Sequence, residues 1–164
     1  MPVQEYRKRF YHHFSDLRRD LGLLMRERKQ IKMLKSGGTI DRAFRERLML
    51  AVTEVNGCRY CAYAHARMAL SAGLTQLDIH ALAEGSLRGS PPEQVPALLY
   101  AQHWAETDAK PDSAARQRVL ETYGQSKTEA IELSLRMIRV GNLLGNTWDY
   151  FMHRVSFGRW GGAE

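Results

Sequence analysis

The fold of this chain is constrained most by a break between two helical patterns, within residues 46–65, ERLMLAVTEVNGCRYCAYAH. An apolar run leads up to Asn56-Gly57, and asparagine and glycine are common where a helix ends. The only two cysteines of the chain, Cys58 and Cys61, follow at once. The stretch therefore predicts a helix, a break and a second helix that begins at the cysteines.

The position of the two cysteines favours an ionised sulfur. The first turn of a helix carries N–H groups without helical partners, and together with the helix dipole they stabilise a thiolate. At about 100° per residue, Cys58, Cys61 and His65 lie on one face of the second helix. The pattern predicts a dithiol with a titratable partner one turn away. We expect Cys61 to be the more reactive thiol, with a pKa below that of an ordinary cysteine.

The rest of the sequence predicts helices and no strand. Apolar residues recur at helical spacing, and nowhere do they alternate with polar residues as in a half-buried strand. Capping patterns lie at Thr75 with Asp78, at Ser90 and at Ser126, and Gly124 is a stop signal. We expect an all-α fold, a single-domain bundle of about seven or eight helices. After the first helix these cover residues 41–55, 58–72, 76–86, 90–107, 112–123 and 126–145.

A long basic helix is predicted over residues 4–35. Its apolar stripe consists of Phe10, Phe14, Leu17, Leu21, Leu24 and Ile31. Residues 1–35 also carry ten Lys and Arg against four Asp and Glu, which accounts for the whole formal net charge of +6. We interpret the charge as a solvated helix face, and we do not expect nucleic-acid binding. Because so much exposed apolar surface needs a partner, the stripe predicts a homo-oligomer.

Length and composition limit the class of protein further. A chain of 164 residues fits one domain. No apolar stretch approaches the roughly 18 residues of a membrane span, and the charged N-terminus lacks the apolar core of a signal peptide. Two cysteines three positions apart suggest redox or metal chemistry in the cytoplasm rather than a disulfide framework, and no membrane association is expected.

The spacing Glu46-x11-Cys58-x2-Cys61-x3-His65 resembles the signature of a known family. This is the alkylhydroperoxidase D-like, or carboxymuconolactone decarboxylase, family. A CxxC motif alone is common in proteins. The histidine and the distant glutamate together make the resemblance more specific.

The resemblance covers more than these four residues. It continues through AYAHARMALSAGLT to Thr75, and a second similar stretch covers residues 141–149. It implies that residues 39–164 form an alkylhydroperoxidase D-like domain, to which residues 1–38 add an N-terminal amphipathic basic helix. Tyr60 departs from the pattern, because some peroxidase members carry a histidine between the cysteines.

The family resemblance implies a thiol-dependent peroxidase or disulfide oxidoreductase that needs no cofactor and no metal. By resemblance, Cys61 attacks the peroxide and becomes a sulfenic acid, while Cys58 is the resolving thiol and proton donor. An external dithiol then reduces the Cys58–Cys61 disulfide. The resemblance also implies trimers or hexamers.

Other interpretations of the CxxC motif stay open at this point. A zinc site would need a fourth ligand beyond Cys58, Cys61 and His65, and a structural disulfide across three positions would restrain little chain. Family members that keep the fold and act as binding proteins are a further possibility. The alternative functions are a lactone decarboxylase, as in the second name of the family, and a non-enzymatic protein that acts through its basic N-terminal helix.

The carboxylate that serves the thiols has two candidates. On one straight helix Glu46 and Cys58 would lie ~18 Å apart, too far for proton transfer. If the chain reverses at the break, Glu46 lies next to His65, whereas Glu54 lies level with the cysteines. We therefore predict the order Glu46–His65–Cys61, in which Glu46 orients and charges His65 and His65 takes the thiol proton, with Glu54 as the rival. The alternative is that Glu46 is an ordinary surface residue.

A second polar group lies in the last predicted helix. Gly141 and Gly145 are four residues apart and let another backbone approach closely, and Asn142 and Asn146 repeat the same spacing. We interpret the asparagines as caps near a helix break at residues 146–148. In the functional alternative they line the floor of the thiol pocket.

Overall fold

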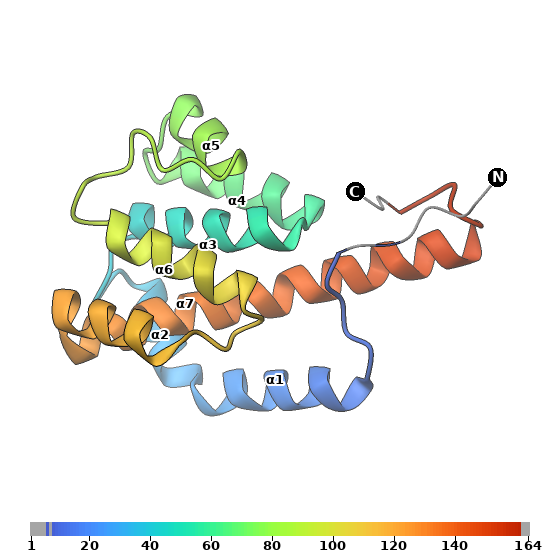
Figure 1. Cartoon of the computed structure of the whole chain (residues 1–164), viewed down its shortest axis with the longest axis horizontal. Helices are drawn as coiled ribbons and strands as arrows, with labels where there is room; N and C mark the ends of the chain where they lie inside the picture. Colours follow the sequence, from blue (N-terminus) through green and yellow to red (C-terminus); the bar gives the residue numbers. More distant parts are fainter. Residues whose placement is uncertain (1–5, 7, 162–164) are drawn as a thin grey trace.

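The structure is a computed structural model that describes residue 6 and residues 8–161. Over these residues the fold is all-α, as the sequence predicted, and contains no strand. These residues form seven helices that pack around a larger and a smaller apolar core (Figure 1). They are α1 (Phe14–Arg26), α2 (Arg28–Lys35), α3 (Arg42–Asn56), α4 (Arg59–Ser71), α5 (Gln76–Ala83), α6 (Val95–Glu106) and α7 (Ser113–Val155).

Helix α3 lies at the centre and contacts α4, α5, α6 and α7. Figure 1 shows it between the α4–α5 pair and α7. Its predicted apolar face is buried, since Phe44, Leu48 and Val52 are at most 2% exposed. The side chain of Asp41 caps its start, and Gly57 ends it with a φ of 67°. A glycine suits this end because the left-handed region strains residues with a Cβ.

The starts of α5 and α6 differ in how well local signals predicted them. Thr75 and Asp78 form the expected capping box at the start of α5. The predicted start of the next helix at Ser90 is wrong, because α6 begins at Val95. The chain first makes a turn in which the N–H of Gln94 donates to the carbonyl of Pro91 at 2.8 Å.

Helix α7 is longer than the sequence predicted. Gly124 interrupts it with a φ of 74° and a ψ of 170°, at the predicted stop, and helical structure resumes at once. The predicted end near Gly145 and the break at residues 146–148 are wrong, because the helix continues to Val155. Asn146 and Asp149 lie on a buried face of this continuation, and packing on that face holds it helical. Figure 1 shows this half of α7 projecting beyond the other helices.

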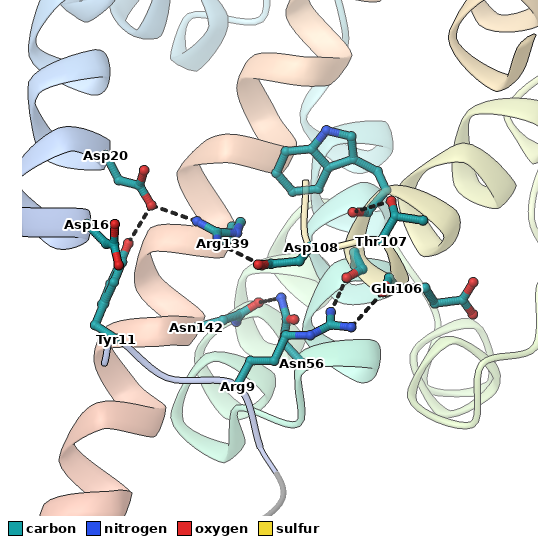
Figure 2. A network of polar contacts seen from close by, with 12 residues as sticks. Arg9, Tyr11, Asp16, Asp20, Asn56, Glu106, Thr107, Asp108, Arg139 and Asn142 are labelled. Atoms are coloured by element: carbon teal, nitrogen blue, oxygen red, sulfur yellow. Dashed lines mark hydrogen bonds and ion pairs between the residues drawn. The ribbon is translucent and has the colours of Figure 1, made fainter. Parts of the chain in front are cut away.

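The single helix predicted over residues 4–35 is wrong. Residues 8–13 are not helical, and Glu27 separates α1 from α2; residues 4 and 5 lie outside the described part of the chain. The Phe10 ring stacks on Tyr150 of α7, with centroids 4.0 Å apart. Arg9 donates to the last carbonyl groups of α6 (Figure 2). These contacts with distant residues hold the segment along α7 and prevent it from extending α1.

Helices α1 and α2 pack against α7 of the same chain. Leu24 and Ile31 of the predicted stripe face the core, whereas Phe14 is 79% exposed. A domain division at residue 38 stays a prediction. No helix within the described residues combines the length and apolar character that crossing a membrane requires.

Candidate functional site

Cys58 and Cys61 lie at the start of α4, where the sequence placed them. Cys58 is the N-cap residue, and its Sγ accepts the backbone N–H of Cys61 at 3.4 Å. Both thiols are free. Cys58 is buried at 1% exposure, whereas Cys61 is half-buried, so Cys61 is the thiol that a reagent reaches more easily.

The surroundings of the two sulfurs place the negative charge on Cys58. A hydrogen bond from the Cys61 thiol lowers the pKa of Cys58 to about 6, and the backbone N–H groups of Cys61 and Tyr60 and the side chain of Asn142 add to this effect against burial. The same hydrogen bond to Cys58, together with burial, raises the pKa of Cys61. The lowered pKa was predicted for Cys61, whereas these contacts lower the pKa of Cys58. The N-cap sulfur faces the unpaired N–H groups, and Cys61 acts as a donor to it.

Glu46 contacts His65 as the chain reversal predicted. Its Oε2 lies 2.7 Å from Nδ1 of the imidazole, and Glu46 is only 2% exposed. Arg45 provides a second partner, with Nη2 3.7 Å from Oε1. A buried carboxylate requires such partners. The interpretation of Glu46 as a surface residue is wrong. His65 follows Cys61 by four residues on α4, which places both on one face of the helix.

Glu54 points elsewhere. It is exposed, and its carboxylate lies against Gly85, beyond the end of α5. Partial burial and the nearby charge of Glu106 raise the pKa of this carboxyl group. The contacts of Glu54 are thus on the side of α3 that faces Gly85 and Glu106, and Glu46 is the carboxylate that meets the imidazole.

Helix α7 leaves space for both sulfurs. A Cβ atom added to Gly141 would lie 3.6 Å from Sγ of Cys61, and one added to Gly145 would lie 2.7 Å from Sγ of Cys58. The close approach predicted for these glycines is therefore real, although the atoms that approach are side-chain sulfurs and not backbone. A side chain at position 145 would overlap with Cys58.

The asparagines beside these glycines are buried in mid-helix, so the prediction that they lie at a break in their own helix is wrong, although Asn146 does bond backbone carbonyl groups. Asn142 is fully buried and donates from Nδ2 to Thr53 Oγ1 at 3.0 Å. Asn146 donates to the carbonyl of Asn56 at 2.8 Å and to that of Arg9 at 2.9 Å. The pair therefore ties α7 to the end of α3, immediately before the cysteines. The Asn142 side chain also lowers the pKa of both cysteine thiols, in agreement with the pocket-floor alternative.

Asp149 is a buried carboxylate near the site that sequence reasoning missed. It is 0% exposed, and its Oδ1 accepts from Arg59 Nη2 and from the Tyr60 hydroxyl, each at 2.8 Å. Tyr60, at the position where some peroxidases carry a histidine, is thereby held toward α7. Polar residues at positions 142, 146 and 149 follow helical spacing, and this regularity was the available signal for a polar buried face.

The fold and the site define a class of protein: an all-α protein with a dithiol at a helix N-terminus and a buried carboxylate–imidazole pair beside it. A sequence model of the carboxymuconolactone decarboxylase family matches residues 24–107, slightly more than half of the chain. The chain belongs to this family. No curated protein and no solved structure matches it. The matched region contains Glu46, both cysteines and His65, whereas the glycines and asparagines of α7 lie outside it.

Proposed function

We propose that this protein is a thiol-dependent peroxidase or disulfide oxidoreductase. The observation that carries the proposal is the thiol pair itself. A thiolate at Cys58 accepts a hydrogen bond from the more exposed Cys61, beside a buried Glu46–His65 pair. A thiolate is the nucleophilic form of cysteine, and a second thiol within reach allows a reversible disulfide.

In the proposed reaction Cys61 is the attacking residue. The Cys58 thiolate takes the proton of Cys61, and the Cys61 sulfur attacks the terminal oxygen of the peroxide. The S–O bond forms as the O–O bond breaks, and the leaving alkoxide takes the proton from Cys58. The Cys58 thiolate then attacks the sulfenic sulfur. An S–S bond forms, and the departing hydroxide is protonated to water.

His65 and Glu46 supply the last proton in this scheme. The reaction consumes one proton from solvent for each disulfide formed, and His65 lies one turn from Cys61 on the same helix face. With a proton on Nδ1, the ring donates to Glu46 and directs Nε2 to proton transfer. Glu46 is then a positioning residue, and His65 acts as the general acid and base.

An external dithiol completes the cycle. Its thiolate attacks the Cys58–Cys61 disulfide, a mixed disulfide forms, and its second thiol releases the reduced protein. The chemistry requires no cofactor. A reducing compartment such as the cytoplasm suits this reductant, and we propose that the protein works there as a homo-oligomer.

The experiment is peroxide consumption with tert-butyl hydroperoxide as oxidant and dithiothreitol as reductant. We expect turnover by the wild-type protein and none by Cys58→Ser or Cys61→Ser. Ala64→Ser, an exposed change on the same helix, is the matched control and retains turnover. Dimedone added to Cys58→Ser during prolonged peroxide treatment is expected to label Cys61. The sulfur is oxidised slowly without Cys58 to take its proton, but no thiol remains to resolve the sulfenic acid. Wild-type consumption no faster than that of dithiothreitol alone contradicts the proposal.

The second candidate is the lactone decarboxylation that gives the family its name. It is favoured by the buried Glu46–His65 pair, because an acid and base of this kind serves proton transfer without any thiol. The same preparations are therefore given a carboxylated lactone, and carbon dioxide release is measured. Release that persists in Cys61→Ser and is lost in His65→Ala supports the decarboxylase.

A further inference from the structure

One face of α7 lies directly against the thiol pair. Gly141 is opposite the sulfur of Cys61, and Gly145 is opposite the sulfur of Cys58. Asn142 lies between these glycines in the sequence and is fully buried. Its amide group is therefore enclosed on the side of α7 that both sulfurs approach.

The orientation of this amide is fixed by α3. Its Oδ1 accepts from Asn56 Nδ2 at 3.2 Å, and its Nδ2 donates one hydrogen to Thr53 Oγ1 at 3.0 Å. Figure 2 shows Asn142 and Asn56 facing one another across the two helices. Reversing the amide would lose the bond with Asn56, because two amide nitrogens would then face each other. The second Nδ2 hydrogen is left for the sulfurs, and the Asn142 side chain lowers the pKa of both cysteines.

We propose that Asn142 is a positioning residue for the dithiol, whose second amide hydrogen donates to whichever of Cys58 and Cys61 carries the negative charge. The role in turnover rests on the proposed function, whereas the hydrogen bond to sulfur does not. A fixed donor that reaches both sulfurs stabilises the thiolate wherever it forms, without reorganisation of the surroundings.

The donor acts at two points of the cycle. Before oxidation it stabilises the Cys58 thiolate. During reduction, the external thiolate attacks one sulfur of the disulfide. A new S–S bond forms to that sulfur, the Cys58–Cys61 bond breaks, and its electron pair goes to the other sulfur. That sulfur leaves as a thiolate and receives the Asn142 hydrogen. The external dithiol supplies both electrons.

The test measures thiolate formation and does not depend on peroxidase activity. The reduced wild-type protein and Asn142→Leu, which has similar size and no donor, are titrated by thiolate absorbance near 240 nm and by iodoacetamide alkylation. We expect the lowest thiol midpoint to rise by about one pH unit in Asn142→Leu, as expected for a lost hydrogen bond to a charged group. The alkylation rate at high pH stays unchanged, because the thiol is then ionised in both proteins.

Thr128→Val is the matched control. Thr128 is also fully buried on α7, and its hydroxyl donates to the Val119 carbonyl at 3.4 Å, so the change removes a buried hydrogen bond elsewhere on the helix. We expect a lower unfolding midpoint and no shift of the thiol titration. Equal titration shifts in Thr128→Val and Asn142→Leu, or no shift in a folded Asn142→Leu, overturn the proposal.

A measurement on the wild-type protein keeps the proposal testable even where Asn142→Leu does not fold. The side-chain amide resonances of Asn142 are followed by ¹⁵N NMR while the reduced protein is titrated. One of its two hydrogens is expected to move downfield with the midpoint of Cys58, because a thiolate is the stronger acceptor. An unchanged position of both hydrogens through that midpoint overturns the assignment.

Discussion

Cys58 and Cys61 differ in chemistry although they are only three residues apart. Cys58 caps α4 and accepts from the N–H of Cys61, whereas Cys61 lies within the first turn and donates its thiol. The cap position thus holds the charge, and the more exposed position offers the attacking sulfur. The sulfur with the lowered pKa is thus the buried Cys58, whereas the sulfur that a substrate can reach is Cys61, which Cys58 activates.

The first prediction concerns pH. The pKa of Cys58 is lowered to about 6, so reduced wild-type protein is expected to gain thiolate absorbance with a midpoint near pH 6. Cys61→Ser keeps a hydroxyl donor and the N–H groups, and is expected to keep a low midpoint. Cys58→Ser is expected to lose it. A low midpoint that persists in Cys58→Ser and disappears in Cys61→Ser would return the charge to Cys61.

The same shift affects stability, with a definite sign. A thiol whose pKa is lower in the folded than in the unfolded chain stabilises the fold above the unfolded value, and this contribution is lost as pH falls through the folded value. Reduced wild-type protein should therefore gain stability over Cys58→Ser as pH rises from about 6 to the ordinary cysteine value of 9.0. Urea unfolding at several pH values measures the difference. A difference that does not change with pH contradicts the shift.

The second prediction concerns Glu46 and His65. If they deliver protons as one unit, Glu46→Gln and His65→Ala should each lower peroxide turnover by roughly 10²–10⁴-fold. The double variant should cost little more than the worse single one. Glu54→Gln is the control, since its carboxylate lies against Gly85, and it should stay close to wild type. Normal turnover in Glu46→Gln together with a large loss in Glu54→Gln would transfer the role to Glu54.

Among the helices, α3, α4, α5 and α7 begin where local signals placed them, whereas the start of α6 and the end of α7 differ from their predicted bounds. Each of α3, α4 and α5 is capped by the residue before it, whose side chain accepts a backbone N–H three residues later. These residues are Asp41, Cys58 and Thr75, so neighbours in the sequence determine where the three helices begin. The end of α7 depends on packing along its whole buried face. Likewise the Phe10–Tyr150 stack joins residues at opposite ends of the chain, and no local pattern contains such information.

The candidate site divides in the same way. The Glu46–His65 contact could be predicted by counting residues on either side of one chain reversal. The lowered pKa of Cys58 could be predicted only in part, because its largest cause is the local hydrogen bond from the Cys61 thiol, whereas the contribution of Asn142 comes from α7. The repeat of asparagine and glycine is visible in the sequence. Whether Asn142 and Asn146 cap helices or line the floor of the thiol pocket depends on how α7 packs against α3, which the sequence does not show.

The third prediction uses the two glycines of α7 as a matched pair. Gly145→Ala would bring a methyl group to 2.7 Å from Cys58 Sγ, and this overlap should destabilise the protein by about 1–3 kcal/mol. Gly141→Ala would bring one to 3.6 Å from Cys61 Sγ, an ordinary contact, and should stabilise the helix by about 0.5–1 kcal/mol. Urea unfolding of the reduced proteins measures both. Equal effects of the two substitutions would contradict the close approach at Gly145.

On the scale of the whole molecule, an apolar face of α7 is exposed among the residues that the structure describes. The residues of this face recur at helical spacing along the C-terminal half of α7, which projects beyond the other helices (Figure 1). The face consists of Leu144 (41% exposed), Trp148 (55%), Phe151 (53%) and Val155 (51%). Tyr60 of α4 (42% exposed) lies beside it, since its hydroxyl donates to Asp149. An apolar helix face of this kind marks an interaction site in most proteins.

The last prediction is that a second copy of the chain covers this face, next to the cysteines. Burying the exposed half of Trp148 and of Phe151 contributes roughly 1 kcal/mol or more for each side chain, and a symmetric contact buries each of them twice. Light scattering of the wild-type protein should give a multiple of the chain mass, and Trp148→Arg with Phe151→Arg should reduce it to one chain. Leu99→Arg, at an equally exposed position on α6, is the control and should leave the mass unchanged. Phe14→Arg tests separately whether the N-terminal stripe takes part. A wild-type protein of single-chain mass contradicts the prediction, and dissociation by Phe14→Arg alone would move the contact to α1.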